Sequence, residues 1–475
     1  MTVVLQPNLV AGKWIRSGKA DVSRDPYRGD AVARVPRGTR AQMSAAIAAA
    51  SRAAPVLAKT PRYLRAEILR AASEGIARVE EDLARLMVRE SGKPLQYARA
   101  EVRRAVVTFR LAAEEAVRFG GEWLAVDVEP RSAGVTCVVE RFPIGPVAAI
   151  TPFNFPINLA AHKLAPALAA GCPVVWKPPV QAPATALRLA EICVAAGWPA
   201  GALSALHCPV PVAAALVRDP RMKMLSFTGS VGVGWALADQ AKRKRVALEL
   251  GGNGVVIVDD DVDLGEVAAK VAIGAFASAG QVCISVQRIY VHRRIYDRFV
   301  SKLLAATAKL PVGDPMKPET VVGPLIDEAA ADRVMGWIDE AKASGAEILC
   351  GDRRKGNVVW PTLIAKAGPK LKVSCEEVFG PVATVASFKN VDEAIALANR
   401  TRYGLQAGIF TRRMDVARRA FLGLDVGGVV VNDTPMLRID NHPYGGVKDS
   451  GSGREGVRSA MMEMTVEKAL LTRYG

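Results

Sequence analysis

Apolar and polar residues alternate with two different periods along this chain. From residue 40 to residue 120 apolar side chains recur at three- and four-residue steps, which predicts helices, and Gly92-Lys93-Pro94 predicts a break between them. Two β-like runs follow over residues 122–128 and 135–142. Their turn residues indicate a hairpin or a protruding ribbon rather than part of a main sheet.

After the ribbon the pattern changes to short apolar runs separated by helical segments. The segments 157–170 and 184–196 have helical spacing, and Gly171 and Gly197 stand where helix C-termini are expected. The apolar runs between the helices are residues 147–150, 174–176, 203–206, 224–227 and 246–248. This alternation predicts a parallel sheet covered by helices. A second α/β series extends to about residue 431, with strands near 255–258, 289–292, 384–387 and 428–431.

Size and composition narrow the class of protein. A chain of 475 residues predicts about three domains or one elaborate α/β unit. It has no apolar stretch of transmembrane length and no basic, apolar leader at its start, so we expect neither a membrane span nor a secretory signal. Seven cysteines without a Cys-x-x-Cys pair argue against a disulfide framework, and four histidines show no metal spacing. We therefore expect a cytoplasmic protein without a metal.

The formal net charge of +16 raises the question of nucleic acid. The basic run at residues 242–245 directly precedes an apolar run, and a solvated loop before a strand explains it more simply. No nucleic-acid-binding module or basic tail is present. A nucleic-acid-binding protein remains the alternative of a different class. We expect the positive charge to attract anionic small molecules instead.

Cys283 and Glu249 are the strongest candidates for chemistry. Cys283 ends Gly280-Gln-Val-Cys, where small neighbours suit an accessible thiol nucleophile, although a lone cysteine is more often a buried small hydrophobe. Glu249 ends an apolar run and precedes two glycines, a position suited to activating water. Together they indicate a reaction in which a thiol captures a carbon centre and water later releases it.

Polar motifs also follow the predicted parallel strands, at the ends where open sheets bind ligands. Asn154 could donate to an oxyanion or cap a turn, and Lys177 could reach a ribose or phosphate or lie at the surface. Gly229 and Ser230 open a helix that could hold a pyrophosphate. Farther along, the run Glu376-Glu-Val-Phe-Gly-Pro offers a carboxylate for a ribose and an aromatic ring for a nicotinamide, or is an ordinary acidic loop.

Taken in order, these motifs resemble the NAD(P)-dependent aldehyde dehydrogenase superfamily over essentially the whole chain. The matching runs are Thr151-Pro-Phe-Asn-Phe-Pro, Phe227-Thr-Gly-Ser, Leu248-Glu-Leu-Gly-Gly, Gly280-Gln-Val-Cys, Glu376-Glu-Val-Phe-Gly-Pro and Pro443-Tyr-Gly-Gly-Val-Lys-Asp-Ser-Gly. The resemblance implies an α/β fold with a Rossmann-type cofactor domain (1–122 and 142–250), an α/β catalytic domain (251–440) and a small β oligomerisation ribbon (123–141 and 455–475). It also implies a homodimer or homotetramer that acts on a small-molecule aldehyde with NAD or NADP.

The resemblance assigns a role to each motif. Cys283 would be the nucleophile, Asn154 would hold the oxyanion, Glu249 would activate water, and Lys163 would lie near Glu249. The implied cofactor residues are Thr151, Pro152, Phe153, Lys177, Gly229, Ser230, Gly234, Leu250, Glu377 and Phe379. Asn432 matches a loop asparagine close to the site. Because Glu249 is present, a CoA-acylating relative, in which a thiol takes the acyl group, is the second choice.

Two departures bear on specificity. Val180 stands where many NAD-preferring members have a glutamate, so no carboxylate would repel the 2′-phosphate of NADP. The run Lys177-Pro-Pro is similar to the non-phosphorylating glyceraldehyde-3-phosphate dehydrogenases, but Val282 replaces the arginine common there. The loop 434–443 is similar to the corresponding loop of aldehyde dehydrogenases that act on small or anionic aldehydes, such as lactaldehyde, sulfolactaldehyde and phosphonoacetaldehyde. We therefore hypothesise that Arg438 or Arg288 contacts an anionic substrate group; the alternative is that both arginines are structural.

Overall fold

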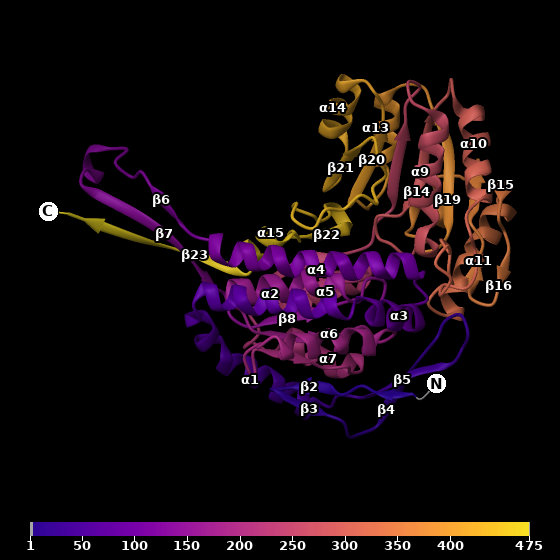
Figure 1. Cartoon of the computed structure of the whole chain (residues 1–475). Coiled ribbons are helices and arrows are strands. Elements are labelled where there is room, and N and C mark those ends of the chain that lie inside the picture. Colours follow the sequence, from indigo (N-terminus) through magenta and orange to yellow (C-terminus); the bar gives the residue numbers. More distant parts are fainter. Residues whose placement is uncertain (1–2, 475) are drawn as a thin grey trace.

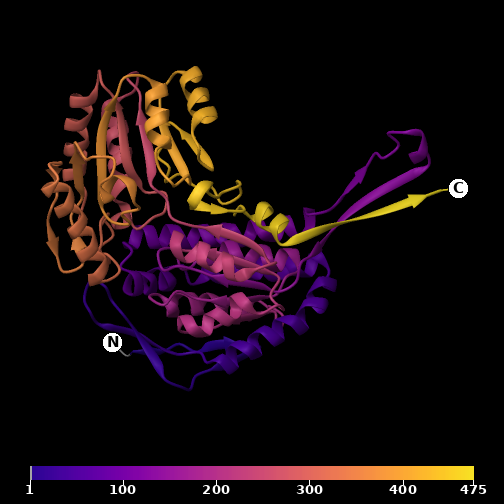
Figure 2. The same cartoon turned by 180° about the vertical axis from the view of Figure 1, so that it is seen from behind.

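Two α/β units lie one against the other, and a three-stranded arm projects from one of them (Figure 1). The computed structural model describes residues 3–474. Figure 2 shows the same arm from behind, with the chain's last strand lying along it. This arrangement follows the α/β fold with a ribbon that the sequence predicted.

The first sheet is built around the five predicted parallel strands. Its order, edge to edge, is β22 (Gly451–Ser452), β12 (Arg245–Glu249), β11 (Met224–Thr228), β8 (Val147–Ile150), β9 (Val174–Lys177), β10 (Leu203–Ala205), β2 (Asn8–Val10) and β3 (Lys13–Ile15). The strands from β12 to β10 are parallel. The short strands β22 and β2 pair antiparallel with β12 and β10, and β3 pairs antiparallel with β2. The sequence did not predict these edge strands, because runs of two or three residues carry no readable period.

Helices cover both faces of this sheet, which explains why its strands are apolar throughout. Val147 and Trp176 point into one core, and their neighbours Ala148 and Val175 point into the other. The first core includes α2 (Arg62–Arg78), α4 (Leu95–Arg118), α5 (Asn158–Ala170) and α6 (Pro183–Ala195), and α3 (Glu80–Ser91) packs beside them. The second includes α1 (Arg40–Lys59), α7 (Val210–Arg218) and α8 (Val231–Ala241). The predicted break is confirmed, since α3 ends at Ser91 and Gly92 adopts a left-handed conformation.

The second sheet belongs to the later half of the chain. Its order is β15 (Glu347–Cys350), β18 (Thr362–Ala365), β19 (Val382–Phe388), β14 (Val286–His292), β13 (Gly254–Val258), β20 (Gln406–Phe410) and β21 (Gly428–Val431), parallel except for β15. One core lies under α9 (Leu264–Phe276), α10 (Tyr296–Ala308) and α11 (Glu328–Ala343). The other lies under α13 (Val391–Asn399) and α14 (Met414–Gly423). The four predicted strands are confirmed, and β18, β20 and β15 are additional.

The arm consists of β6 (Glu122–Leu124), β7 (Val135–Pro143) and β23 (Thr465–Arg473). β7 pairs with β23 antiparallel along all nine residues of each strand, so the ribbon is made from two distant parts of the chain. The helix α15 (Val457–Glu463) lies within the predicted oligomerisation segment 455–475 and packs against α4 and α5. The boundary between body and arm therefore falls near residue 464.

Smaller elements complete the chain without adding to the site. A small N-terminal sheet contains β1 (Val4–Leu5), β5 (Ala31–Pro36) and β4 (Ala20–Arg24), and a hairpin joins β16 (Arg354–Lys355) to β17 (Val358–Val359). A short helix α12 (Lys372–Cys375) precedes β19. Among residues 3–474, no helix combines the length and the apolar character that crossing a bilayer requires.

Candidate active site

The loop that carries Cys283 lies between α9 and β14 and is held in an unusual conformation. Ser278, Ala279 and Gly280 all have positive φ angles, of 54°, 55° and 67°. A Cβ atom on Gly280 would lie 2.1 Å from the Gly380 carbonyl oxygen, so only glycine allows the two loops to meet this closely. Left-handed backbone at two non-glycine residues stores strain, which the surrounding structure must hold in place. The loop therefore presents Cys283 rigidly.

Cys283 is half-buried and lies where two cavities meet. The first cavity has a volume of about 410 Å³ and opens beyond the carboxyl ends of β11 and β12. The second has a volume of about 160 Å³ and lies on the side of α4 and α5. A thiol shared between two cavities can contact a molecule bound in each of them. We name them the large cavity and the small cavity.

Most of the predicted cofactor residues line the large cavity. These are Pro152, Phe153, Gly229, Ser230, Leu250, Glu377 and Phe379. Three others lie behind this lining or beyond it. Thr151 accepts a hydrogen bond from the Trp176 indole at 2.9 Å, and Gly234 packs against Leu250. Lys177 ends β9, and burial lowers the pKa of its ammonium group.

The large cavity has the features that a dinucleotide needs. Ser230 is the N-cap of α8, so unpaired backbone N–H groups and the helix dipole favour a phosphate there. Phe153 and Phe379 meet edge to face with ring centroids 6.0 Å apart. Arg333 and Trp337 of α11 also line the cavity, and sequence reasoning missed both because a helix pattern alone gives no sign of which face meets a ligand.

Glu377 is seated against the glycine pair that follows Glu249. Its Oε1 accepts a hydrogen bond from the Gly252 backbone at 3.0 Å, and a Cβ on Gly251 would lie 2.2 Å from Oε2. Burial raises the pKa of Glu377 to about 7. The two glycines thus form a cradle that a side chain would fill. A ribose with two hydroxyl donors fits this carboxylate.

The carboxyl group of Glu249 closes β12 at the floor of the large cavity. The residue is 5% exposed, and its Oε2 is buried without a hydrogen-bond partner among the described residues. Burial and the neighbouring negative charge of Glu455 raise the pKa of Glu249 well above its ordinary value. A carboxylate with a free oxygen and raised basicity is suited to accept a proton from water.

A buried charged network lies beside Glu249. Lys163 donates to Glu455 Oε1 at 3.0 Å and to Ser226 Oγ at 3.1 Å, and Arg438 donates to Glu455 Oε2 at 2.8 Å. Although burial acts in the opposite direction, the positive charges of Lys163 and Arg438 lower the pKa of Glu455 to about 2. Glu455 was missed by sequence reasoning. Its run, Gly453-Arg-Glu-Gly, resembles any polar loop until folding places it against Lys163.

Asn154 lies on the other side of the nucleophile loop. Its amide Nδ2 donates to the Gln281 carbonyl at 3.1 Å, and Oδ1 is buried without a partner in the part of the chain that the structure describes. One Nδ2 hydrogen is used by Gln281, and the second is free to donate. Burial raises the pKa of the nearby Cys283 thiol to about 11.

The small cavity combines apolar walls with two arginines. Phe155, Val282 and Ile284 form part of its wall, and Arg104 and Arg438 contribute guanidinium groups. Arg104 pairs with Asp440 through two hydrogen bonds of 2.7 and 3.2 Å. Arg438 lies over the Tyr444 ring at 3.8 Å from its centroid. Arg104 lies on α4 and was not among the predicted site residues.

The structure does not bring Arg288 to either cavity. Its guanidinium donates to Asn253 Oδ1 at 2.9 Å and to the carbonyls of Asn253, Leu397 and Ala398. These acceptors use the hydrogen-bond donors of the Arg288 guanidinium and hold the end of α13 against the sheet. Of the two arginines in the sequence hypothesis, Arg438 lines the small cavity, and Arg288 lines neither of the two cavities.

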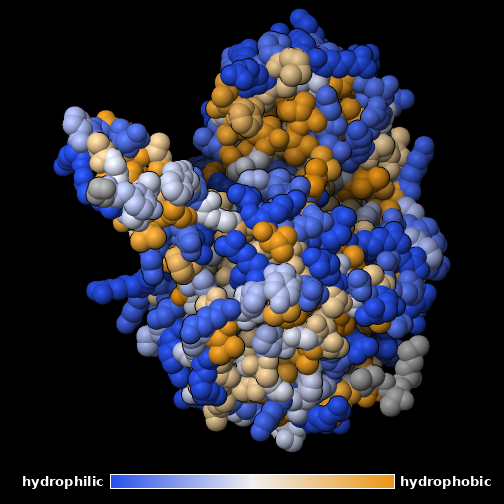
Figure 3. Space-filling model, turned by 60° about the vertical axis from the view of Figure 1, so that its left-hand side comes forward, coloured by the Kyte–Doolittle hydropathy of each residue, from blue (hydrophilic) through white to orange (hydrophobic). Residues whose placement is uncertain are grey.

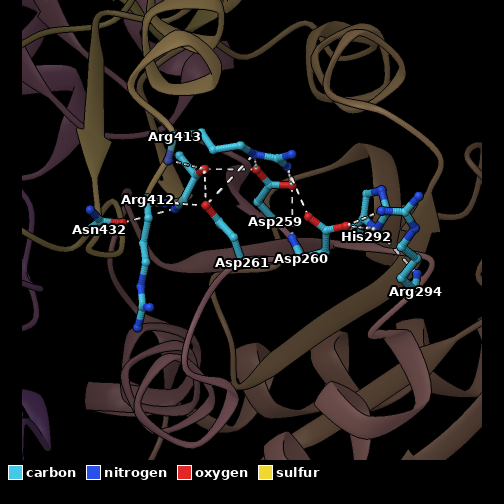
Figure 4. Close-up of polar contacts among 9 residues, drawn as sticks. Asp259, Asp260, Asp261, His292, Arg294, Arg412, Arg413 and Asn432 are labelled. Carbon is cyan, nitrogen blue, oxygen red and sulfur yellow. Dashed lines mark hydrogen bonds and ion pairs between the residues drawn. The ribbon is translucent and has the colours of Figure 1, made fainter.

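Asn432 also lies away from Cys283. It follows β21, at the carboxyl end of the second sheet, whereas Cys283 precedes β14 at the amino end. Its Oδ1 accepts from the Thr411 backbone at 3.0 Å. Figure 4 shows it beside the acidic run 259–261, which binds Arg413. The expected position close to the site is therefore not found, because the strand carries Asn432 to the opposite edge.

The site combines a thiol shared by two cavities, a buried carboxylate with a raised pKa and a cavity with features suited to a dinucleotide. The sequence profile described as "Aldehyde dehydrogenase family" matches residues 14–470, and the chain belongs to this family. It is an NAD(P)-dependent oxidoreductase that acts on aldehydes and yields carboxylic acids.

Several named relatives are similar in sequence to this chain over almost its whole length. A 3-sulfolactaldehyde dehydrogenase of Priestia aryabhattai is 41% identical over 474 residues, covering 99% of each chain. The NADP(+)-dependent succinate-semialdehyde dehydrogenase of Escherichia coli is 39% identical over 459 residues, covering 95% of this chain and 94% of its own. The crystal structure of aldehyde dehydrogenase 21 from Physcomitrella patens with its product succinate has a TM-score of 0.98 and 42% identity, covering 100% and 99%.

Proposed function

We propose that this enzyme oxidises a short aldehyde that carries a carboxylate or sulfonate group, and that Arg438 and Arg104 hold this group in the small cavity. The observation that carries the proposal is the Arg438 side chain, which lines this cavity while its Nε has no hydrogen-bond partner among residues 3–474. A guanidinium that lines a cavity and keeps one N–H unpaired can donate to a further acceptor. An anionic substrate oxygen supplies one.

The named relatives support this substrate class. Sulfolactaldehyde and succinate semialdehyde both carry an acidic group a few carbons from the aldehyde. The small cavity, at about 160 Å³, has space for a molecule of that size between Cys283 and Arg438. Its apolar walls would contact the carbon chain, and the guanidinium groups would fix the charged end.

The protein groups then act in a fixed order. The Cys283 sulfur attacks the aldehyde carbon and forms a carbon–sulfur bond, while the carbonyl oxygen takes the negative charge. The Asn154 Nδ2 and the Cys283 backbone N–H hold that oxyanion. A nicotinamide bound in the large cavity supplies a hydride acceptor, so the aldehyde carbon is oxidised by two electrons to the thioester level. Glu249 then takes a proton from water, hydroxide adds to the thioester, and the sulfur leaves as thiolate.

The large cavity fits NAD or NADP. Glu377 in its glycine cradle would bind one ribose, and the start of α8 would bind the pyrophosphate. Lys177 at the end of β9 would reach the adenosine ribose. Because Val180 is exposed and carries no charge, nothing at that position repels a 2′-phosphate. We therefore propose that NADP is accepted.

A substrate comparison tests the anionic-group proposal. We compare kcat/KM for succinate semialdehyde and for pentanal, a neutral aldehyde of similar length, in the wild type and in Arg438→Gln and Arg104→Gln. A charge-assisted hydrogen bond is worth about 1.5–3 kcal/mol, so each variant should lose about 10- to 100-fold with the anionic substrate. The ratio of the two substrates is decisive, because both arginines also hold carboxylates. An equal loss with both aldehydes rejects the proposal.

The arm is proposed to join two copies of the chain. Trp123, Leu470 and Leu471 on the arm are each more than 60% exposed, and Figure 3 shows hydrophobic surface along it. A projecting ribbon that leaves such side chains exposed is typical of an interface. Leu470→Lys with Leu471→Lys should lower the mass measured by light scattering. A wild type that is already monomeric contradicts this proposal.

A further inference from the structure

The hydroxyl of Tyr444 is the polar group in contact with the nucleophile. Its oxygen lies 3.4 Å from the Cys283 sulfur, within hydrogen-bonding distance for a sulfur atom. Both residues line the small cavity, so the contact is made on the side from which an aldehyde reaches the sulfur. The reaction as described above assigns no task to this hydroxyl.

Tyr444 is held firmly in this position. Its backbone forms a short antiparallel bridge with Glu455, with hydrogen bonds of 3.0 and 2.6 Å. The Arg438 guanidinium covers one face of its ring at 3.8 Å, and the ring of His442 meets it edge-on with centroids 6.2 Å apart. Tyr444 is 3% exposed. A phenol fixed on its backbone and on its ring can hold only one orientation toward the sulfur.

We propose that Tyr444 is a further catalytic residue, whose hydroxyl donates a hydrogen bond to the Cys283 thiolate and keeps the sulfur turned toward the small cavity. This inference rests on the proposed thiol mechanism and deepens it. Burial, and then the adjacent Cys283, raise the pKa of Tyr444 well above its ordinary value. The phenol therefore keeps its proton at neutral pH and acts as a donor, not as an acid.

The hydrogen bond has a use at two stages. Before attack it stabilises the negative charge on sulfur, in a site where burial alone disfavours that charge. When the carbon–sulfur bond forms, the charge moves to the carbonyl oxygen and the hydroxyl is released. When hydroxide adds to the thioester and the carbon–sulfur bond breaks, the electron pair returns to sulfur and the same hydroxyl receives it. Tyr444 loses no proton in either step.

The groups that face the Cys283 sulfur influence the pKa of its thiol. Glu377 and Glu249 disfavour the thiolate, and Arg438 and the Tyr444 hydroxyl favour it. Of the two stabilising groups, only the hydroxyl can be removed without changing a charge. Tyr444→Phe deletes that single oxygen and keeps the ring under Arg438.

The experiment is the pH dependence of Cys283 alkylation by iodoacetamide in the substrate-free enzyme, followed by mass spectrometry of the Cys283 peptide. Because the pKa of the Cys283 thiol is raised to about 11, the rates are compared below that pKa, where alkylation is proportional to the thiolate fraction. Between about pH 7 and pH 9 the rate should fall by about 10- to 100-fold in Tyr444→Phe, the loss expected for a hydrogen bond to a charged group. The kcat/KM at pH 7 should fall by about tenfold. Tyr296→Phe, at the start of α10, removes a hydroxyl far from the sulfur and should leave both values unchanged.

An alkylation rate in Tyr444→Phe equal to that of the wild type across this pH range overturns the proposal, whatever happens to turnover, because a side chain that only fills space would not change the thiolate fraction of Cys283. Tyr444→Leu provides a second variant without a hydroxyl, and the same decrease in alkylation rate is expected there. Alkylation needs no aldehyde and no cofactor. A failure of the anionic-substrate proposal therefore leaves this result intact, and the two can be distinguished.

Discussion

Lys163 and Glu455 form a buried ion pair, with 3.0 Å between Nζ and Oε1, across 292 residues of sequence. Both side chains are less than 10% exposed. Burial and the negative charge of Glu455 together raise the pKa of Glu249, while Arg438 and Lys163 act in the opposite direction. The basicity of Glu249, the proposed general base, thus depends on charged residues that lie far from it in the sequence.

Glu455→Gln should shift the pH profile of kcat. Glu249 must be ionised to accept a proton, so its raised pKa makes turnover fall as pH is lowered through that pKa. Removing the Glu455 charge lowers the pKa of Glu249 and moves this acidic limb to lower pH. The free energy of unfolding should also drop by about 3–5 kcal/mol, because Lys163 and Arg438 lose a buried partner. Glu266→Gln, on the exposed side of α9, should change neither quantity; an unmoved acidic limb in Glu455→Gln contradicts the coupling.

Glu249→Gln should separate the two halves of the reaction. The introduced amide has nearly the same shape as the carboxylate but cannot take a proton from water, so acylation proceeds and the thioester accumulates. Stopped-flow absorbance at 340 nm should show one equivalent of reduced cofactor formed in a burst, followed by a steady state slower by about 10²–10⁴-fold. Cys283→Ala should show no burst. A normal steady state in Glu249→Gln would reject the role of Glu249.

Gly251→Ala should weaken cofactor binding specifically. The added methyl group would lie 2.2 Å from Glu377 Oε2, so the carboxylate must leave its seat and lose the Gly252 hydrogen bond. The Kd for NAD(P) should rise by about 10- to 100-fold, measured by quenching of tryptophan fluorescence. Gly336→Ala in α11 adds a methyl group with nothing within 4 Å and serves as the control. Equal cofactor affinity in both variants would show that Glu377 does not hold the ribose.

Val180→Glu should change cofactor preference. The exposed position lies three residues beyond Lys177, where a carboxylate would repel the 2′-phosphate and accept the hydroxyls of an unmodified ribose. The ratio of kcat/KM for NADP to that for NAD should fall by at least about tenfold. Val180→Gln keeps a similar size without charge and should change the ratio much less. If both variants give the same ratio, charge at this position does not decide the preference.

The helical region before Gly120, the five parallel strands and the ribbon could be predicted because their periods are local. A run such as residues 224–227, bounded by turn residues, needs only its neighbours to be read as a buried strand. The residues at the strand ends were predictable for a related reason. Once the strands are parallel, Asn154 and Glu249 must lie at one edge of the sheet, at the ends of β8 and β12.

Other parts of the site depend on contacts that local sequence does not encode. Arg288 and Arg438 are both arginines near a motif, yet one is bound by backbone carbonyls and the other faces a cavity. Asn432 follows β21 and Cys283 precedes β14, so the two residues lie at opposite ends of the parallel strands of one sheet. The motif match therefore did not predict their distance in space.

The sequence by itself determined the position of Glu249 at the end of its strand, the loop that carries Cys283 and the succession of parallel strands along the chain, since each follows from residues within a few positions. Only the tertiary structure decided the environment of these groups. Tyr444 reaches Cys283 across 161 residues, and Glu455 reaches Lys163 across 292. Hydrogen bonds and charges act over a few ångströms of space, whatever the separation along the chain.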